Sequence, residues 1–108
     1  MFQNDSYVTR GIKEKINKKN PVTFLLLWDL IDEMAIAKKD YMQIFILRTG
    51  ANKKGIQEIE HMQEEPPYRN IHRYFTASTI DAKIYVIDDG EHSTMMLAEE
   101  YYFIKNKL

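Results

Sequence analysis

The chain has 108 residues, of which 44% are hydrophobic and 29% charged, with 15 basic and 16 acidic side chains, a net charge of -1 and no cysteine. This is the size of one domain, residues 1–108, which can fold without a metal or a disulfide. The balanced charge argues against a strongly basic nucleic-acid binder or an acidic DNA mimic, and the lack of cysteine excludes thiolate metal sites and thiol catalysis.

Apolar runs in the sequence are short, the strongest being "FLLLW" and "IFIL". A membrane span needs about 20 apolar residues, and a signal peptide needs an apolar stretch near the start. Neither pattern is visible in "MFQNDSYVTRG". We therefore expect a cytoplasmic protein that does not enter a membrane.

The first predicted elements are a β-prone stretch, residues 7–12, and a helix of about residues 21–38. Asn20 before Pro21 is a suitable N-cap followed by a first-turn proline. Apolar residues then recur every three or four positions, as in Phe24, Leu27, Trp28 and Ile31. The helix is apolar around most of its N-terminal half, so we expect it to be central and covered by a sheet.

A hairpin is predicted next, with strands at residues 41–49 and 56–65 joined by the turn "GANKKG". Pro66 and Pro67 end the second strand because proline cannot donate a ladder hydrogen bond. The stretch "YRNIHRYFTAS" is either a strand or an irregular crossover, and "AKIYVID" is a further strand.

Residues 93–105, "STMMLAEEYYFIK", are rich in strong helix formers and predict a second helix near the C-terminus. The alternative is a hairpin strand, since Asp89-Gly90 is a preferred two-residue turn. That hairpin would place Asp88 opposite Glu91, a like-charge pair. The predicted fold is α+β: a mainly antiparallel sheet of four to five strands packed against the central helix.

The densest group of polar side chains is Asp88, Asp89, Glu91 and His92. These are oxygen and nitrogen ligands that suit a divalent cation or a small ligand, in a site that could be hydrolytic. Their spacing matches no known metal loop, and the alternative is a structural joint in which Asp88 or Asp89 caps a helix. No motif assigns a catalytic residue, a metal ligand or a cofactor.

Two surface features suggest partners. Basic residues cluster near the start of the chain and could form a weak nucleic-acid patch, although the net charge does not favour it: Arg10, Lys13, Lys15, Lys18 and Lys19. Tyr101 and Tyr102, followed by Phe103, cannot all be buried on one face of a terminal helix. Because aromatic residues are enriched at interfaces, we expect a protein partner, for which a second copy of the chain is one candidate.

Five segments carry a resemblance to a known family: "YVTRGI", "LLWDLIDEM", "YMQIF", "HMQEEPPY" and "AKIYVIDDGEHSTMMLAEEY". In these segments the chain resembles the domain of unknown function 960, a family of small proteins from staphylococci and related Firmicutes. The resemblance implies a stand-alone cytoplasmic α+β domain that is often encoded on mobile DNA, including staphylococcal cassette chromosomes. It implies no activity, and the hypothesis at this point is a small non-enzymatic accessory protein that acts through protein contacts.

Overall fold

The computed structural model describes residues 2–50 and 55–107, with the side chains of residues 104–107 left aside. The elements follow one another as β1 (Asp5–Val8), α1 (Arg10–Ile12), the π-helical turn η1 (Lys13–Asn17), α2 (Pro21–Asp32), β2 (Met42–Thr49), β3 (Ile56–Gln63), β4 (Tyr68–Phe75), β5 (Ala82–Asp88), β6 (His92–Leu97) and α3 (Ala98–Lys107). Among these residues, no helix is long and apolar enough to cross a membrane.

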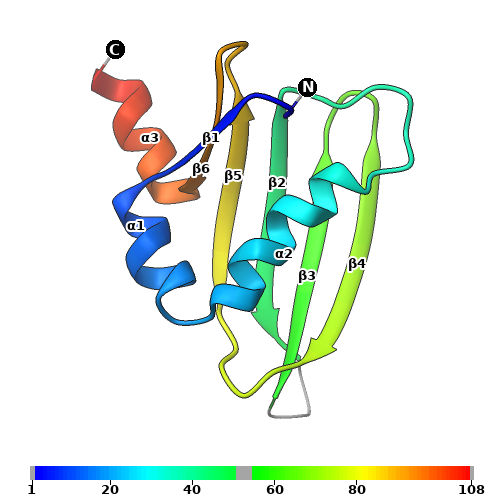
Figure 1. Cartoon of the computed structure of the whole chain (residues 1–108), viewed down its shortest axis with the longest axis vertical. Helices are drawn as coiled ribbons and strands as arrows, with labels where there is room; N and C mark the ends of the chain where they lie inside the picture. The colour runs from blue at the N-terminus through cyan, green and yellow to red at the C-terminus, as the bar shows by residue number, and fades with distance from the viewer. Residues whose placement is uncertain (1, 51–54, 108) are drawn as a thin grey trace.

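Six strands form one sheet in the order β1-β6-β5-β2-β3-β4. Only the β1–β6 pair is parallel, and the other four pairs are antiparallel. The long helix α2 crosses one face of this sheet, over β5, β2 and β3 (Figure 1). We call the face under α2 the inner face, and the opposite side the outer face.

The hydrophobic core lies between α2 and the inner face. Because side chains alternate along a strand, every second residue points toward α2. The buried cluster combines Leu27, Leu30 and Ile31 of α2 with strand residues such as Phe45 and Ile84. Ile12 and Ile16 of α1 and η1 join the same cluster and are fully buried. The first helical turns therefore close one end of the core.

The start of α2 is as predicted, but its end is not. Asn20 is the N-cap, and its side chain accepts a hydrogen bond from the Thr23 amide at 3.2 Å. The helix stops at Asp32, six residues before the predicted end. In the segment that follows, Gln43 Nε2 donates to the Asp40 carbonyl at 3.0 Å, and Gln63 Nε2 to the Lys38 carbonyl at 3.3 Å. The carbonyls of Lys38 and Asp40 thus accept hydrogen bonds from buried glutamine side chains, and the backbone after Asp32 follows these bonds and not a continued helix.

The predicted helix at residues 93–105 is wrong in its first half, where the hairpin alternative is correct. Residues 92–97 form β6, which pairs with β5 on one side and β1 on the other, and α3 begins only at Ala98. Two sheet partners outweigh the helix propensity of Met95, Met96 and Leu97, all of which are buried. The sheet therefore has six strands instead of four to five, while the α+β class is confirmed.

Candidate functional site

Asp88 ends β5 and fastens the N-terminal segment to the sheet. Its carboxylate accepts hydrogen bonds from the Phe2 amide at 2.7 Å, the Gly90 amide at 2.8 Å and the Asn4 side chain at 3.0 Å. The bond from Phe2, followed by those from Gly90 and Asn4, holds the pKa of Asp88 below its ordinary value. With only 6% of its surface exposed, Asp88 is a structural acceptor whose oxygens are already used.

Asp89 organises the turn between β5 and β6. Its backbone amide donates to the His92 carbonyl at 3.0 Å, and its side chain accepts from the amides of Glu91 and His92 at 2.9 Å each. The hydrogen bond from the His92 amide, followed by that from the Glu91 amide, lowers the pKa of Asp89. Gly90 has a φ of +98° between them, a conformation that favours glycine. The turn centres on Gly90 and Glu91, one residue beyond the Asp89-Gly90 centre considered above, so Asp88 pairs with Ser93.

The acidic cluster therefore does not converge on a common point. Asp88 and Asp89 are bonded to backbone amides, Glu91 is exposed, and the His92 ring packs edge-on against Tyr7 with centroids 4.9 Å apart. Neither acid caps a helix, because the chain turns here into a strand. Within residues 2–50 and 55–107, no group of three or more His, Asp or Glu side chains is placed to hold a metal ion.

Tyr101 and Tyr102 lie on α3 with different surroundings. The Tyr101 ring packs edge-on against Tyr85 of the outer face with centroids 5.3 Å apart, whereas Tyr102 is 58% exposed. Helix α3 is fixed by Glu100, whose carboxylate accepts from Thr9 Oγ1 at 2.6 Å and from the Gly11 amide at 3.2 Å. Among the described residues, α3 packs against the outer face at β5 and β6.

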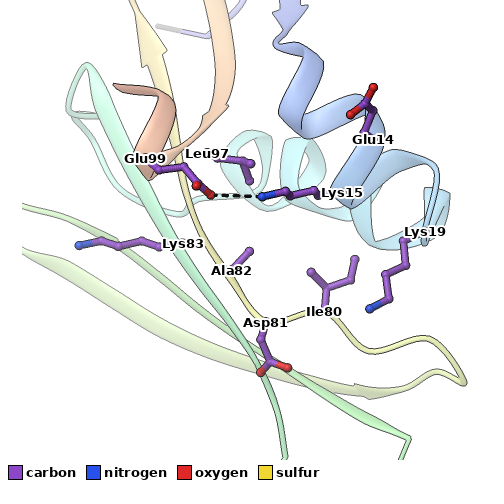
Figure 2. A pocket seen from close by; sticks show the side chains of 9 residues that line it. All are labelled: Glu14, Lys15, Lys19, Ile80, Asp81, Ala82, Lys83, Leu97 and Glu99. Carbon is purple, nitrogen blue, oxygen red and sulfur yellow. Dashed lines mark ion pairs between the residues drawn. The ribbon is translucent and has the colours of Figure 1, made fainter. Parts of the chain in front are cut away.

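The N-terminal basic residues are interspersed with acids. Arg10 pairs with Glu14 at 3.0 Å, and Lys15 with Glu99 at 3.6 Å, while Lys13 and Lys18 are exposed. Figure 2 shows the hollow of about 310 Å³ beside η1, whose lining is Glu14, Lys15, Lys19, Ile80, Asp81, Ala82, Lys83, Leu97 and Glu99. Lys15 reaches toward Glu99, and Lys83 extends away from the other side chains (Figure 2). Three lysines against three acids give this hollow no excess charge to attract a polyanion.

Sequence reasoning missed the outer face of the sheet. Its centre is a half-buried apolar band made by Met42, Ile44, Ile46, Met62, Ile71 and Ile87. The strand registers pair Met42 with Ile87 and Ile44 with Met62, and they place Ile46 and Ile71 on either side of Glu60. Two exposed aromatic side chains border the band, Phe75 on β4 at 84% and Tyr7 on β1 at 50%. The continuous apolar run of β2 at residues 44–47 was the signal that could have revealed it, because alternate residues of a strand face opposite sides of the sheet.

An ion-pair network covers the β2–β3–β4 end of the outer face. Arg48 donates to both Glu58 and Glu60, the latter at 2.8 Å. Arg73 donates to Glu58 at 2.9 Å, and Arg69 donates to Glu60. The pKa of Glu58 lies below its ordinary value because of Arg48 first and Arg73 second. The pKa of Glu60 is lowered in the same way by Arg48 and then Arg69. Both carboxylates are therefore ionised and shared between two guanidinium groups.

The inner face carries an unexpected layer of buried polar side chains on β2 and β3, namely Gln43, Gln57, His61 and Gln63. Gln43 Nε2 donates to Gln63 Oε1 at 2.7 Å, so Gln43 Oε1 faces His61 Nε2, 2.7 Å away, as an acceptor. His61 therefore carries its proton on Nε2. Its Nδ1 is buried and has no hydrogen-bond partner among the residues that the structure describes, and its ring stacks on Phe45 with centroids 4.4 Å apart.

A family model described as staphylococcal protein of unknown function (DUF960) matches residues 5–100, from the start of β1 to Glu100. The chain belongs to this family. The matched range of this DUF960 protein includes the whole sheet and the Glu100 contact that fixes α3. No curated protein matches the chain.

One solved structure supports the fold. The crystal structure of a protein of unknown function from Enterococcus faecalis superposes with a TM-score of 0.72, at 18% sequence identity, over 90% of each chain. At this identity the likeness concerns the fold alone. The DUF960 chain thus shares its architecture with a protein from Enterococcus faecalis.

Proposed function

We propose that this DUF960 protein is a small non-enzymatic binding module that contacts a protein partner through the outer face of its sheet. The observation that carries the proposal is the apolar band of that face, lying on the opposite side of the sheet from α2. Tyr85 and Met96, next to α3, are buried, whereas the residues of the band on β2, β3 and β4 remain half-exposed.

The composition of the outer face is that of an interface. Arginine, methionine and aromatic residues are enriched at protein contacts, and lysine is depleted. The chain has four arginines, and all except Arg10 lie on this face. Met42 and Met62 belong to the band, and Phe75 and Tyr7 stand at its borders.

Charge specifies the chemistry of the partner. Arg48, Arg69, Arg73 and Lys83 lie on the outer face with Glu58 and Glu60, which gives the β2–β5 region two more positive than negative charges although the whole chain has a net charge of -1. Arg69 and Arg73 use Nε for their ion pairs, and their side chains are 61% and 62% exposed. The surface that fits is an apolar strip bordered by carboxylates.

We further propose that the partner serves a mobile genetic element. The resemblance to proteins encoded on mobile DNA supports this. The exposed face supports the protein contact, and the alternatives of a metal site and a nucleic-acid patch have no comparable support. Asp88 and Asp89 are bonded to backbone amides, and Arg10 and Lys15 are paired with acids.

The proposal is tested by binding with matched variants. Ile46→Thr combined with Ile71→Thr removes apolar surface from the band while keeping β-branched side chains that suit a strand. Leu25 of α2 is 59% exposed, and Leu25→Gln is the control because it removes apolar surface away from the band. We expect both wild type and Leu25→Gln to retain a partner from a lysate of the native host. That partner is then identified, purified and titrated against each variant.

The double variant should weaken binding of that purified partner at least about tenfold, since two apolar contacts are lost. Added salt should weaken it further because the flanking contacts are ionic. Equal retention by the double variant, or retention lost only with Leu25→Gln, would disprove the role of the outer face.

A further inference from the structure

The free edge of β4 is an unusually open strand. β4 is the last strand of the sheet, and over all eight of its residues it pairs only with β3 (Figure 1). The register runs from Ile56↔Phe75 to Gln63↔Tyr68 without interruption, so the strand contains no bulge. The opposite edge is β1, which has four residues and leads directly into α1.

Edge strands usually carry devices that prevent pairing with another chain, such as an inserted proline, a lysine, a bulge or a covering loop. β4, "YRNIHRYF", contains neither proline nor lysine. The connection between α2 and β2 passes the end of β4 next to the β3–β4 turn (Figure 1), where Asp40 accepts from the Glu65 amide at 3.1 Å. Beyond that turn Asn70, Arg73 and Phe75 are exposed.

We infer that β4 pairs antiparallel with β4 of a second copy of this chain, so that two six-stranded sheets join into one across a two-fold axis at His72. Partners in an antiparallel pair point to the same face, so the axis must pass through a residue. An axis at Ile71 would set Arg69 opposite Arg73 twice, a like-charge arrangement. An axis at His72 instead sets Arg69 opposite Phe75 and Ile71 opposite Arg73.

The register at His72 is self-complementary. Phe75 is 84% exposed in the single chain, and in the pair each Phe75 lies beside the Arg69 of the other copy on the outer face. A guanidinium over an aromatic ring is a favourable contact, and the symmetry provides it twice. Repulsion between copies is small because the net charge is only -1. The inference concerns the backbone edge of β4, whereas the proposed function concerns side chains of the outer face, although Ile71 belongs to the apolar band. The tests below therefore measure the mass of the chain itself and not the binding of another protein.

The first test is the mass of the full chain in solution over a concentration series, by sedimentation equilibrium. The wild type should shift from the mass of one chain toward that of two. Phe75→Lys should raise the dissociation constant about tenfold or more, because it removes two aromatic contacts and adds two like-charge pairs. Leu25→Lys, at a similarly exposed site on α2, should behave as wild type. A wild type that stays a single chain, or a dimer unaffected by Phe75→Lys, would overturn the inference.

The second test uses the absence of native cysteine. Residues directly opposite in an antiparallel pair have Cα atoms about 4.5–5.5 Å apart, which is within the range that a disulfide spans. Under oxidation at dimer-forming concentrations, His72→Cys should form a linked dimer, whereas Ile71→Cys and Asn70→Cys should not. Equal linking of all three positions, linking at Ile71 in place of His72, or no linking at all would contradict the register.

Discussion

His61 makes acid stability a direct test of the buried polar layer. Its side chain is fully buried, with Nε2 bonded to Gln43 and Nδ1 unpartnered. Burial first, and then the positive charges of His72 and Lys39, lower the pKa of His61 from 6.5 to about 4. Protonation would place a charge and an unsatisfied N–H group inside the core.

The expected loss of stability follows from that pKa. Below pH 6.5 the unfolded chain binds a proton at His61 that the folded chain does not bind until about pH 4. The free energy of unfolding therefore falls as the pH decreases through this window. Each unit of pKa difference corresponds to about 1.4 kcal/mol, so lowering the pH from 7 to 4.5 should cost about 2 kcal/mol through His61 alone.

Urea unfolding of wild type and His61→Gln across this pH range isolates the effect. Glutamine can still donate to Gln43 but does not titrate, and the acids that titrate at low pH are common to both proteins. The wild type should lose about 2 kcal/mol more than the variant between pH 7 and 4.5. Parallel pH profiles of the two proteins would refute the neutral, buried state of His61.

Three further substitutions test the turn and the C-terminal helix, each by chemical denaturation. Asp88→Ala should lower the free energy of unfolding by about 1–3 kcal/mol because it leaves the Phe2 amide without its acceptor. Asp89→Ala in the exposed turn should cost less, and equal losses for the two variants would contradict this expectation. Gly90→Ala should cost about 1 kcal/mol, since φ at this residue is +98°. Glu100→Ala should cost about 1–2 kcal/mol and accelerate amide exchange at Gly11, and unchanged exchange would show that Glu100 does not fix α3 there.

Local signals in the sequence predicted the elements that depend on local interactions. The N-cap of α2 depends on Asn20 and Pro21, and β2, β3 and β5 follow from short apolar runs between turn residues. β6 was considered only as the hairpin alternative, because its residues are strong helix formers and its pairing with β1 involves residues more than 80 positions earlier. The end of α2 was missed for the same reason, since glutamines of β2 and β3 bind the backbone after it.

The candidate site shows a similar division. The cluster at Asp88 was visible in the sequence, but the amide of Phe2 that occupies its carboxylate comes from the other end of the chain. The outer face required three strand registers before Ile44, Ile46 and Ile71 could be placed on one surface. The sequence prediction placed the protein contact at Tyr101 and Tyr102, whereas the contact surface proposed from the structure lies on β2, β3 and β4.

Photo-crosslinking in the native host tests the proposed contact surface most directly. A photo-reactive amino acid at the position of Ile46 lies in the middle of the apolar band and away from the β4 edge, and the same group at Leu25 reports on the solvent side of α2. The account predicts an adduct with one protein partner from position 46 and none from position 25. No adduct at position 46, or the same adducts from both positions, would contradict it.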